Sequence, residues 1–178
     1  EGVPVILDAK RGDIPETQKY YAQAYFEKWN VAAVTVNPYL GFDSCLPFLS
    51  YPGKCVYLLG LTSNGGSEDI QRKPSESGEV CDHVFGMAAQ ARSCPATPGL
   101  VVGLTSVTNE MLARIPDVPL LIPGLGAQGG DLKILSKIRR ASPILVNVSR
   151  SLLYGSEDEK IWQRARTYVE VINHAFQN

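Results

Sequence analysis

The sequence predicts an α/β fold built around a parallel β-sheet. Apolar, β-rich runs recur along the chain, segments with helical character lie between most of them, and polar and glycine-rich residues gather after the runs rather than before them. Strands that alternate with helices in this way pair in parallel. The chain has 178 residues, 44% of them hydrophobic, which is enough for one normal core, so a single domain over residues 1–178 is expected.

The elements follow from these patterns in order along the chain. Six apolar runs are predicted to form strands, at residues 3–7, 31–36, 55–61, 100–104, 119–122 and 144–148. Helices are predicted over residues 15–29, 79–92, 109–115, 131–139 and 158–176. The first helix starts at a proline, as helices often do, and its apolar stripe is expected to face the core or a subunit interface; the stripe consists of Ile14, Tyr21, Tyr25 and Trp29.

The position of the polar residues favours a site at the carboxyl ends of the strands. In a parallel barrel, the loops that follow the strands share one rim, and this rim carries the chemistry. In an open, doubly wound sheet, the site would instead lie where the strand order reverses. Six strands alone do not decide between the two architectures.

The first of these polar segments holds two carboxylates and a lysine. Side chains alternate along a strand, so Asp8 and Lys10 are expected to point the same way, and Asp13 stands at the entrance of the first helix. Carboxylates beside a lysine keep it protonated and aimed, which suits a proton donor to a carbanion. The alternative is a solvated loop with weak ion pairs.

A second segment, residues 123–131, has four glycines between a predicted strand and a predicted helix. Glycines let backbone N–H groups approach an anion, and a helix N-terminus favours it. The spacing matches neither a Walker A loop nor a dinucleotide fingerprint, so NAD and ATP are not expected. Arg150 follows the next strand and could grip a phosphate, although this loop could be a plain connector and Arg150 a surface charge.

A third segment, residues 62–67, offers hydroxyl and amide groups after the third predicted strand. These groups could bind the polar edge of a ring. The Gly- and Ser-rich run that continues to about residue 78 could also act as a lid that excludes water, or be an ordinary turn.

The charge balance, the apolar runs and the cysteine pattern indicate which ligands and which cellular location to expect. Lys and Arg total 17 against 18 Asp and Glu, so neither nucleic acid nor a membrane is indicated, and a small molecule is the expected ligand. No apolar run is long enough to span a bilayer and no signal-peptide pattern is present, which predicts a cytoplasmic location. The cysteines form no metal-binding pattern and are expected to be reduced, buried residues; they are Cys45, Cys55, Cys81 and Cys94.

Taken together, several motifs closely resemble the orotidine 5'-monophosphate decarboxylase family, including the decarboxylase domain of UMP synthase-type proteins. The motifs are LDAKRGDIPETQKYY, VTVNPYLGFDS, LTSNGGS, GLVVGLT, LIPGLGAQGGD and ILVNVSRSLLYG. The resemblance implies a TIM (β/α)₈ barrel, usually homodimeric, that converts orotidine 5'-monophosphate to UMP and CO₂ in pyrimidine biosynthesis. It also implies that no metal or organic cofactor takes part.

The resemblance implies a role for each matching residue. Lys10 would donate a proton to C6 of the pyrimidine and Asp8 would lie beside the substrate carboxylate. The residues that would reach into the partner subunit's site are Asp13, Ile14 and Thr17. Ser63 would hydrogen-bond the pyrimidine edge, and Gln128 would bridge the base and phosphate ends. Arg150 and the backbone near Gly129 would hold the phosphate, and Pro123 would help to line the pocket.

One departure is large: a barrel needs eight strands and the sequence supplies six. They correspond to strands 3 to 8 of the family, so the chain is expected to be a barrel domain truncated at its N-terminus. Two other functions stay open, a magnesium-dependent sugar-phosphate decarboxylase of the same superfamily and a non-catalytic UMP-binding remnant. The residues that favour the nucleotide decarboxylase are Ile14, Thr17 and Gln128.

Overall fold

The structure is a computed structural model that describes residues 2–76, 78–105, 107–124, 134, 140–155 and 159–176. In this part of the chain, the main sheet has six strands in the order β1-β2-β3-β6-β7-β8, and every neighbouring pair is parallel. The strands are β1 (Ile6–Arg11), β2 (Ala33–Val36), β3 (Cys55–Leu61), β6 (Thr97–Val102), β7 (Leu120–Ile122) and β8 (Ile144–Val146). Two residues each form the small antiparallel hairpin of β4 (Pro74–Ser75) and β5 (Gly78–Glu79).

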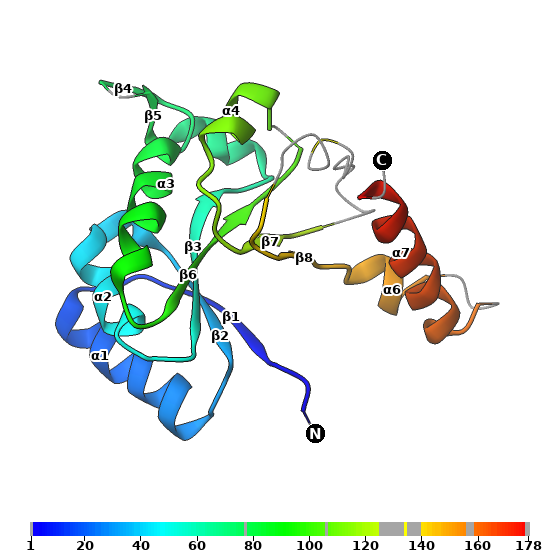
Figure 1. Cartoon of the computed structure of the whole chain (residues 1–178), viewed down its shortest axis with the longest axis horizontal. Helices are drawn as coiled ribbons and strands as arrows, with labels where there is room; N and C mark the ends of the chain where they lie inside the picture. The colour runs from blue at the N-terminus through cyan, green and yellow to red at the C-terminus, as the bar shows by residue number, and fades with distance from the viewer. Residues whose placement is uncertain are drawn as a thin grey trace.

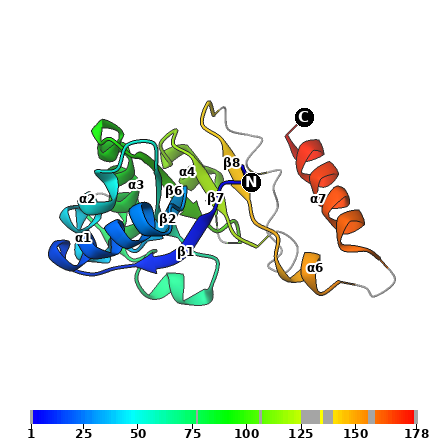
Figure 2. The ribbon, with the colours of Figure 1, turned by 90° about the horizontal axis from the view of Figure 1, so that it is seen from below.

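This strand order distinguishes the two predicted architectures. A doubly wound sheet reverses its strand order at one point, whereas here the order in space follows the order in the chain. The sheet curls into part of a barrel, with α1, α2 and α3 on its outer side and α6 and α7 beyond β8 (Figures 1 and 2). The fold is therefore a half-barrel of the (β/α)₈ type.

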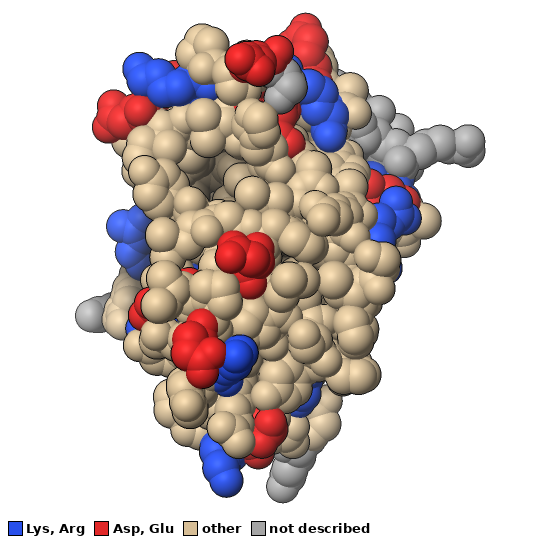
Figure 3. Space-filling model, turned by 90° about the vertical axis from the view of Figure 1, so that its left-hand side faces the viewer, with Lys and Arg blue, Asp and Glu red and all other residues tan. Residues whose placement is uncertain are grey.

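Helices α1 to α4 lie between strands along the chain, whereas α6 and α7 follow β8. The α-helices are α1 (Pro15–Gln23), α2 (Phe42–Leu49), α3 (Val80–Gln90), α4 (Asn109–Arg114), α6 (Arg150–Leu153) and α7 (Ile161–Ala175). A π-helical turn, η1 (Ala24–Lys28), continues α1, and the 3₁₀ turns are η2 (Pro38–Leu40), η3 (Gly65–Asp69) and η4 (Ala91–Ser93). The face on the side of α1, α2 and α3 carries most of its charged side chains toward its two ends (Figure 3).

The core lies mainly between the sheet and the helices. Side chains on the outer face of the strands are fully buried there, including Val34, Leu58, Leu100 and Leu120. The inner face carries only a small buried cluster of Ala33, Tyr57 and Val101. Within the described residues, β1 and β8 each pair with a strand on one side only. The sheet is thus packed from outside and open from inside.

The first strand differs from the predicted strand, which covered residues 3–7. β1 begins at Ile6 and continues to Arg11, because Leu7 pairs with Val34 and Arg11 pairs with Val36. The three residues between Leu7 and Arg11 therefore stand opposite Thr35 alone, which is a β-bulge. The bulge keeps polar residues in the strand, a feature that an apolar-run criterion does not detect.

The remaining elements differ from their predictions mostly at the ends. β3 has the predicted bounds, whereas β6 begins at Thr97 instead of residue 100. α2 was not predicted; it encloses Pro47, a residue that normally interrupts helices, and it forms because its apolar side packs into the core. The predicted helix over residues 131–139 lies outside the described residues except for Ile134, which is helical.

The predicted stripe on the first helix is only partly buried in the core of this chain. Tyr25 is buried and Tyr21 is half-buried, whereas Ile14 and Trp29 are 58% and 63% exposed; Gln18, Ala22 and Phe26 are also buried. The π-helical turn from Ala24 changes the helical period, so the buried face shifts relative to a continuous α-helix. Tyr21, Tyr25 and Trp29 still form a row of ring contacts along the helix, with centroids 5.9 and 5.2 Å apart.

The structure bears on two further predictions, that no segment spans a membrane and that the cysteines are reduced and buried. No helix in the described part of the chain combines the length and apolar character needed to cross a bilayer. Cys45 and Cys81 are buried, whereas Cys55 and Cys94 are half-buried; all four thiols are free.

Candidate active site

A pocket of about 420 Å³ opens at the carboxyl ends of the strands. Its walls combine apolar side chains of the inner sheet face with polar side chains from β1, from the turn after β3 and from the end of β8. The polar residues are Asp8, Lys10, Thr62, Ser63, Asn64 and Asn147. Four of the predicted site residues therefore lie together in this pocket, namely Asp8, Lys10, Ser63 and Pro123.

Asp8 and Lys10, here named the charged pair, meet at the wall of the pocket. Lys10 Nζ donates to Asp8 Oδ2 at 2.5 Å. Both side chains stay accessible, with 51% of Lys10 and 61% of Asp8 exposed, so a ligand in the pocket can reach them. Lys10 has a backbone φ of +48°, a conformation that few residues other than glycine adopt, and it lies within the bulge of β1.

Thr35, on the neighbouring strand β2, hydrogen-bonds both residues of the charged pair. The sequence did not indicate Thr35 as a site residue. The Thr35 hydroxyl donates to Asp8 Oδ1 at 2.9 Å and accepts from the Lys10 backbone N–H at 2.9 Å. Its side chain is fully buried. A single polar residue inside the apolar run of β2 was the available signal, because alternation places it on the inner face of the sheet.

The surroundings of Asp8 favour its ionised form. Burial acts to raise the pKa of the Asp8 carboxyl, but hydrogen bonds from Lys10 and Thr35 and the positive charge of Lys10 together lower this pKa below its usual range. Asp8 thus carries a negative charge beside the Lys10 ammonium at neutral pH. A fixed anion and a fixed cation therefore line the same wall.

Asp13, Ile14 and Thr17 lie outside this pocket, at the start of α1. The Asp13 carboxylate accepts the backbone N–H of Ile14 at 2.8 Å. Among the described residues, no ion pair joins Asp13 to Lys10. Within one chain, the expected set of two carboxylates around the lysine is therefore reduced to Asp8 and Lys10.

The turn after β3 is held in place by Gln71, another residue that the sequence reasoning did not identify. Gln71 Oε1 accepts the Thr62 backbone N–H and Gln71 Nε2 donates to the Thr62 hydroxyl, both at 2.8 Å. The Thr62 hydroxyl in turn donates to Asn64 Oδ1 at 2.6 Å. These bonds fix the backbone on both sides of Ser63, which faces the pocket. No sequence signal pointed to this long-range amide.

The predicted phosphate end is only partly described. Pro123 lines the pocket, whereas Gln128 and Gly129 lie outside the described residues. Arg150 begins the short helix α6 and does not line the pocket. Asn147, three positions earlier, does line it, and its side-chain amide donates to Ser149 Oγ at 3.2 Å.

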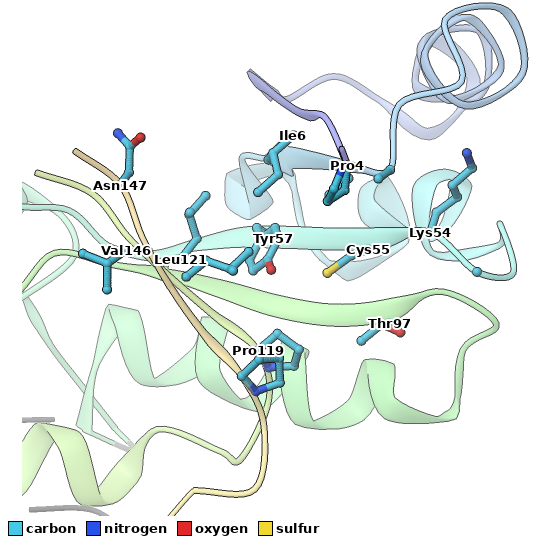
Figure 4. A pocket seen from close by; sticks show the side chains of 15 residues that line it. Pro4, Ile6, Lys54, Cys55, Tyr57, Thr97, Pro119, Leu121, Val146 and Asn147 are labelled. Atoms are coloured by element: carbon cyan, nitrogen blue, oxygen red, sulfur yellow. The ribbon is translucent and has the colours of Figure 1, made fainter. Parts of the chain in front are cut away.

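A larger cavity of about 620 Å³ opens at the opposite end of the same inner face (Figure 4). Its lining includes Lys54, Cys55, Tyr57 and Thr97 and contains no carboxylate. Burial raises the pKa of the Cys55 thiol to about 11, which makes it a poor nucleophile at neutral pH. The smaller pocket, which contains the charged pair, is therefore the candidate active site.

One further cluster has metal-ligating groups. Glu79, Cys81 and Asp82 place their ligand atoms within 4.8 Å of one another at the start of α3. Arg114 pairs with Glu79 at 3.1 Å and with Asp82 at 3.0 Å, and Arg72 pairs with Glu79 at 3.3 Å. These carboxylates are thus committed to arginines and to the helix start, so the cluster is an ion-pair network outside both pockets.

Comparison with known proteins identifies one family that matches nearly the whole chain. The sequence model of the orotidine 5'-phosphate decarboxylase / HUMPS family matches residues 1–165. The orotidine 5'-phosphate decarboxylase of Cupriavidus metallidurans is 44% identical over 170 residues, which are 93% of this chain and 62% of that protein. That of Delftia acidovorans is 41% identical over 185 residues, 99% of this chain and 67% of that protein. The chain thus spans about 62% of the length of the first of these relatives.

Solved structures show the same likeness. The UMP synthase of Leishmania donovani superposes with a TM-score of 0.87 at 40% identity, over 98% of this chain and 39% of that chain. The OMP decarboxylase of the same organism superposes with a TM-score of 0.83 at 36% identity, over 99% of this chain and 70% of that chain. These similarities agree with the half-barrel architecture and with the family that the motifs resemble.

Proposed function

The chain belongs to the orotidine 5'-phosphate decarboxylase / HUMPS family, and from this membership we propose that it decarboxylates orotidine 5'-monophosphate to UMP and CO₂ in pyrimidine biosynthesis. One observation carries the proposal: Asp8 and Lys10 form an ion pair at the wall of a pocket at the carboxyl ends of the strands. This rim is where barrels of this class hold their catalytic groups.

The reaction requires an environment that stabilises negative charge on carbon. When the bond between C6 and the carboxylate breaks, the electron pair stays on C6 and CO₂ leaves. Fixed charges and prompt protonation must then stabilise the carbanion. In the proposed mechanism the Lys10 ammonium supplies both, since its charge faces C6 and its proton forms the new C–H bond.

Asp8 has two proposed roles beside Lys10. Its carboxylate accepts a hydrogen bond from the Lys10 ammonium at 2.5 Å and so holds the ammonium in place. Placed beside the substrate carboxylate, it also adds a repulsion that disappears as neutral CO₂ departs. Two unit charges at ~4 Å interact by about 4 kcal/mol at an effective dielectric constant of ~20.

The remaining contacts with substrate are proposed from the family motifs. Ser63 would hydrogen-bond the pyrimidine edge, and its position in the pocket wall between Thr62 and Asn64 supports this role. Pro123 would line the pocket. Gln128 would bridge the base and phosphate ends, and Gly129 and Arg150 would bind the phosphate, where a guanidinium can donate two parallel hydrogen bonds. Phosphate binding far from C6 would orient the reacting group.

The proposal includes a homodimer in the cytoplasm. Asp13, Ile14 and Thr17 would enter the partner subunit's site, which is consistent with their position outside the pocket of their own chain. Exposed apolar side chains near the same rim support an interface there, since Ile14 is 58% and Tyr39 is 75% exposed.

The whole protein is proposed to be one barrel domain of eight strands. In the described residues β1 and β8 are edge strands, and the inner face between them is open. Unpaired strand edges and exposed inner apolar surface are unfavourable in a barrel fold. Two further βα units would pair with both edges and complete the charge arrangement around Asp8.

The proposal is tested by measuring CO₂ release from carboxyl-labelled orotidine 5'-monophosphate in EDTA, with the full-length protein and its Lys10→Ala variant. We expect turnover by the wild type and a loss of about 10³-fold or more in the variant, because no other described lysine or arginine lines the pocket. UMP binding should be largely retained, since the phosphate contacts lie elsewhere. Lys28→Ala, an exposed lysine on η1, is the matched control and should leave turnover unchanged.

Three other results would contradict parts of the proposal. UMP binding without CO₂ release by the wild type would indicate a non-catalytic nucleotide-binding protein. Activity that depends on added magnesium, or on a sugar phosphate as substrate, would indicate the other branch of the superfamily. Near-normal turnover by Lys10→Ala would overturn the role given to Lys10.

A further inference from the structure

The Thr35 hydroxyl contacts both members of the charged pair. It lies on β2, the neighbour of the strand that carries Asp8 and Lys10, and it is fully buried beneath them. Its oxygen is 2.9 Å from Asp8 Oδ1 and 2.9 Å from the Lys10 backbone nitrogen. Thr35 does not line the pocket, so its action on a ligand must be indirect.

The direction of these hydrogen bonds follows from the groups involved. A backbone N–H can only donate, so the Thr35 oxygen accepts from Lys10. The single hydroxyl proton is then free to point at Asp8 Oδ1. With Lys10 Nζ on Oδ2, both oxygens of the Asp8 carboxylate receive a donor, an arrangement that favours the ionised carboxylate and restricts rotation of its side chain.

The same hydroxyl replaces a backbone hydrogen bond that the bulge removes. Between Leu7 and Arg11 the ladder to β2 is interrupted. The Lys10 N–H within this interval is satisfied by the Thr35 side chain, and Lys10 adopts its positive φ at this point. The hydroxyl therefore fixes the point from which the lysine side chain leaves the strand.

We propose that Thr35 is a positioning residue that fixes the charge state of Asp8 and the direction of Lys10 for proton transfer. Its kinetic consequence rests on the proposed decarboxylase function, whereas its effect on Asp8 does not. The hydroxyl is the essential part of the side chain, and serine can supply it while valine cannot.

The kinetic test compares Thr35→Val and Thr35→Ser with the wild type in the full-length protein. We expect kcat of Thr35→Val to fall about 10- to 100-fold, since a hydrogen bond to a charged group is lost, while KM changes by less than about threefold. Thr35→Ser should recover most of kcat. Thr97→Val removes a hydroxyl at the other end of the sheet, next to the larger cavity, and should leave both constants unchanged.

A second readout does not depend on activity. Titration of the Asp8 carboxyl carbon by NMR should show its midpoint about one pH unit higher in Thr35→Val than in the wild type. Thr35→Ser should titrate close to the wild type. If Thr35→Val does not fold, Thr35→Ala and Thr35→Ser replace it as the comparison, because they differ only in the hydroxyl.

The outcomes separate this inference from the proposed function. A wild-type protein without decarboxylase activity but with a hydroxyl-dependent Asp8 titration would overturn the proposed function and leave the positioning role standing. An active enzyme whose kcat and Asp8 titration are the same with and without the hydroxyl would overturn the positioning role. A rise in KM alone would also overturn it, since that result would assign Thr35 to substrate binding.

Discussion

At the scale of single residues, the candidate site depends on an acid whose charge is set by opposing effects. Burial disfavours the Asp8 carboxylate, but two hydrogen bonds and the Lys10 charge outweigh it and lower the pKa. Because the charged pair is accessible to solvent, its ion pair contributes only modestly to the free energy of unfolding. In the proposed mechanism, the pair presents a proton and a negative charge side by side to the substrate.

The lowered pKa of Asp8 predicts a specific dependence of stability on pH. Ionised Asp8 stabilises the folded state above the unfolded-state pKa near 4, and this contribution is lost as the pH falls through the lower folded-state value. In urea unfolding between about pH 5 and pH 2, the wild type should therefore lose stability more steeply than Asp8→Asn. Parallel curves for the two proteins would show that the Asp8 pKa is not lowered in the folded state.

At the scale of elements, the turn after β3 depends on one distant amide. Gln71 holds Thr62 by two hydrogen bonds and thereby positions Ser63 at the pocket. Because loops at such rims contribute binding groups, the order of this turn should influence substrate affinity.

Gln71→Leu should release this turn. We expect faster amide hydrogen exchange at Thr62, because both hydrogen bonds from Gln71 are lost. We also expect KM to rise about tenfold, which corresponds to a net loss of roughly 1.4 kcal/mol. Gln71→Glu keeps the acceptor for the Thr62 N–H and is the matched comparison; it should preserve slow exchange at Thr62. Equal exchange rates in both variants would mean that Gln71 does not hold the turn.

The sequence predicts elements well where a short-range pattern defines them. β3 has its predicted bounds because it is a continuous apolar run, and α1 begins at Pro15 as predicted. The bulge of β1 could not be predicted, since it depends on register with Val34 and Val36 across the sheet. For the same reason the sequence indicated Asp8 and Lys10 but not Thr35, whose role exists only through pairing with a neighbouring strand.

At the scale of the whole molecule, the sheet has a packed outer face and an open inner face. Strands in sequential order and helices on the outer side are the geometry of a barrel, but β1 and β8 do not meet. Motif resemblance anticipated this arrangement of six strands. The position of Arg150 outside the pocket could not be anticipated, because it depends on how α6 leaves β8.

The proposed closure of the barrel can be measured by amide exchange in the full-length protein. Asn147 donates to Ile122 on β7, so the alternating N–H groups of Ile144 and Val146 point away from β7. We expect these two amides to exchange as slowly as those of Leu58 in the central strand β3. Exchange within minutes would show that β8 remains an edge and would contradict the eight-stranded barrel.

The contact between Thr35 and Asp8 has a consequence for how the protein forms. The two residues are 27 positions apart and belong to consecutive parallel strands joined by α1. The entropic cost of closing a chain segment rises slowly with its length, by about 0.6 kcal/mol for each doubling of the number of residues. Bringing these two residues together therefore costs little more than closing a shorter segment. The acid, the lysine and the hydroxyl therefore come together within a single βαβ unit, formed by β1, α1 and β2. In a chain that emerges from the ribosome, this cluster can be assembled before β3, β6, β7 and β8 have been synthesised.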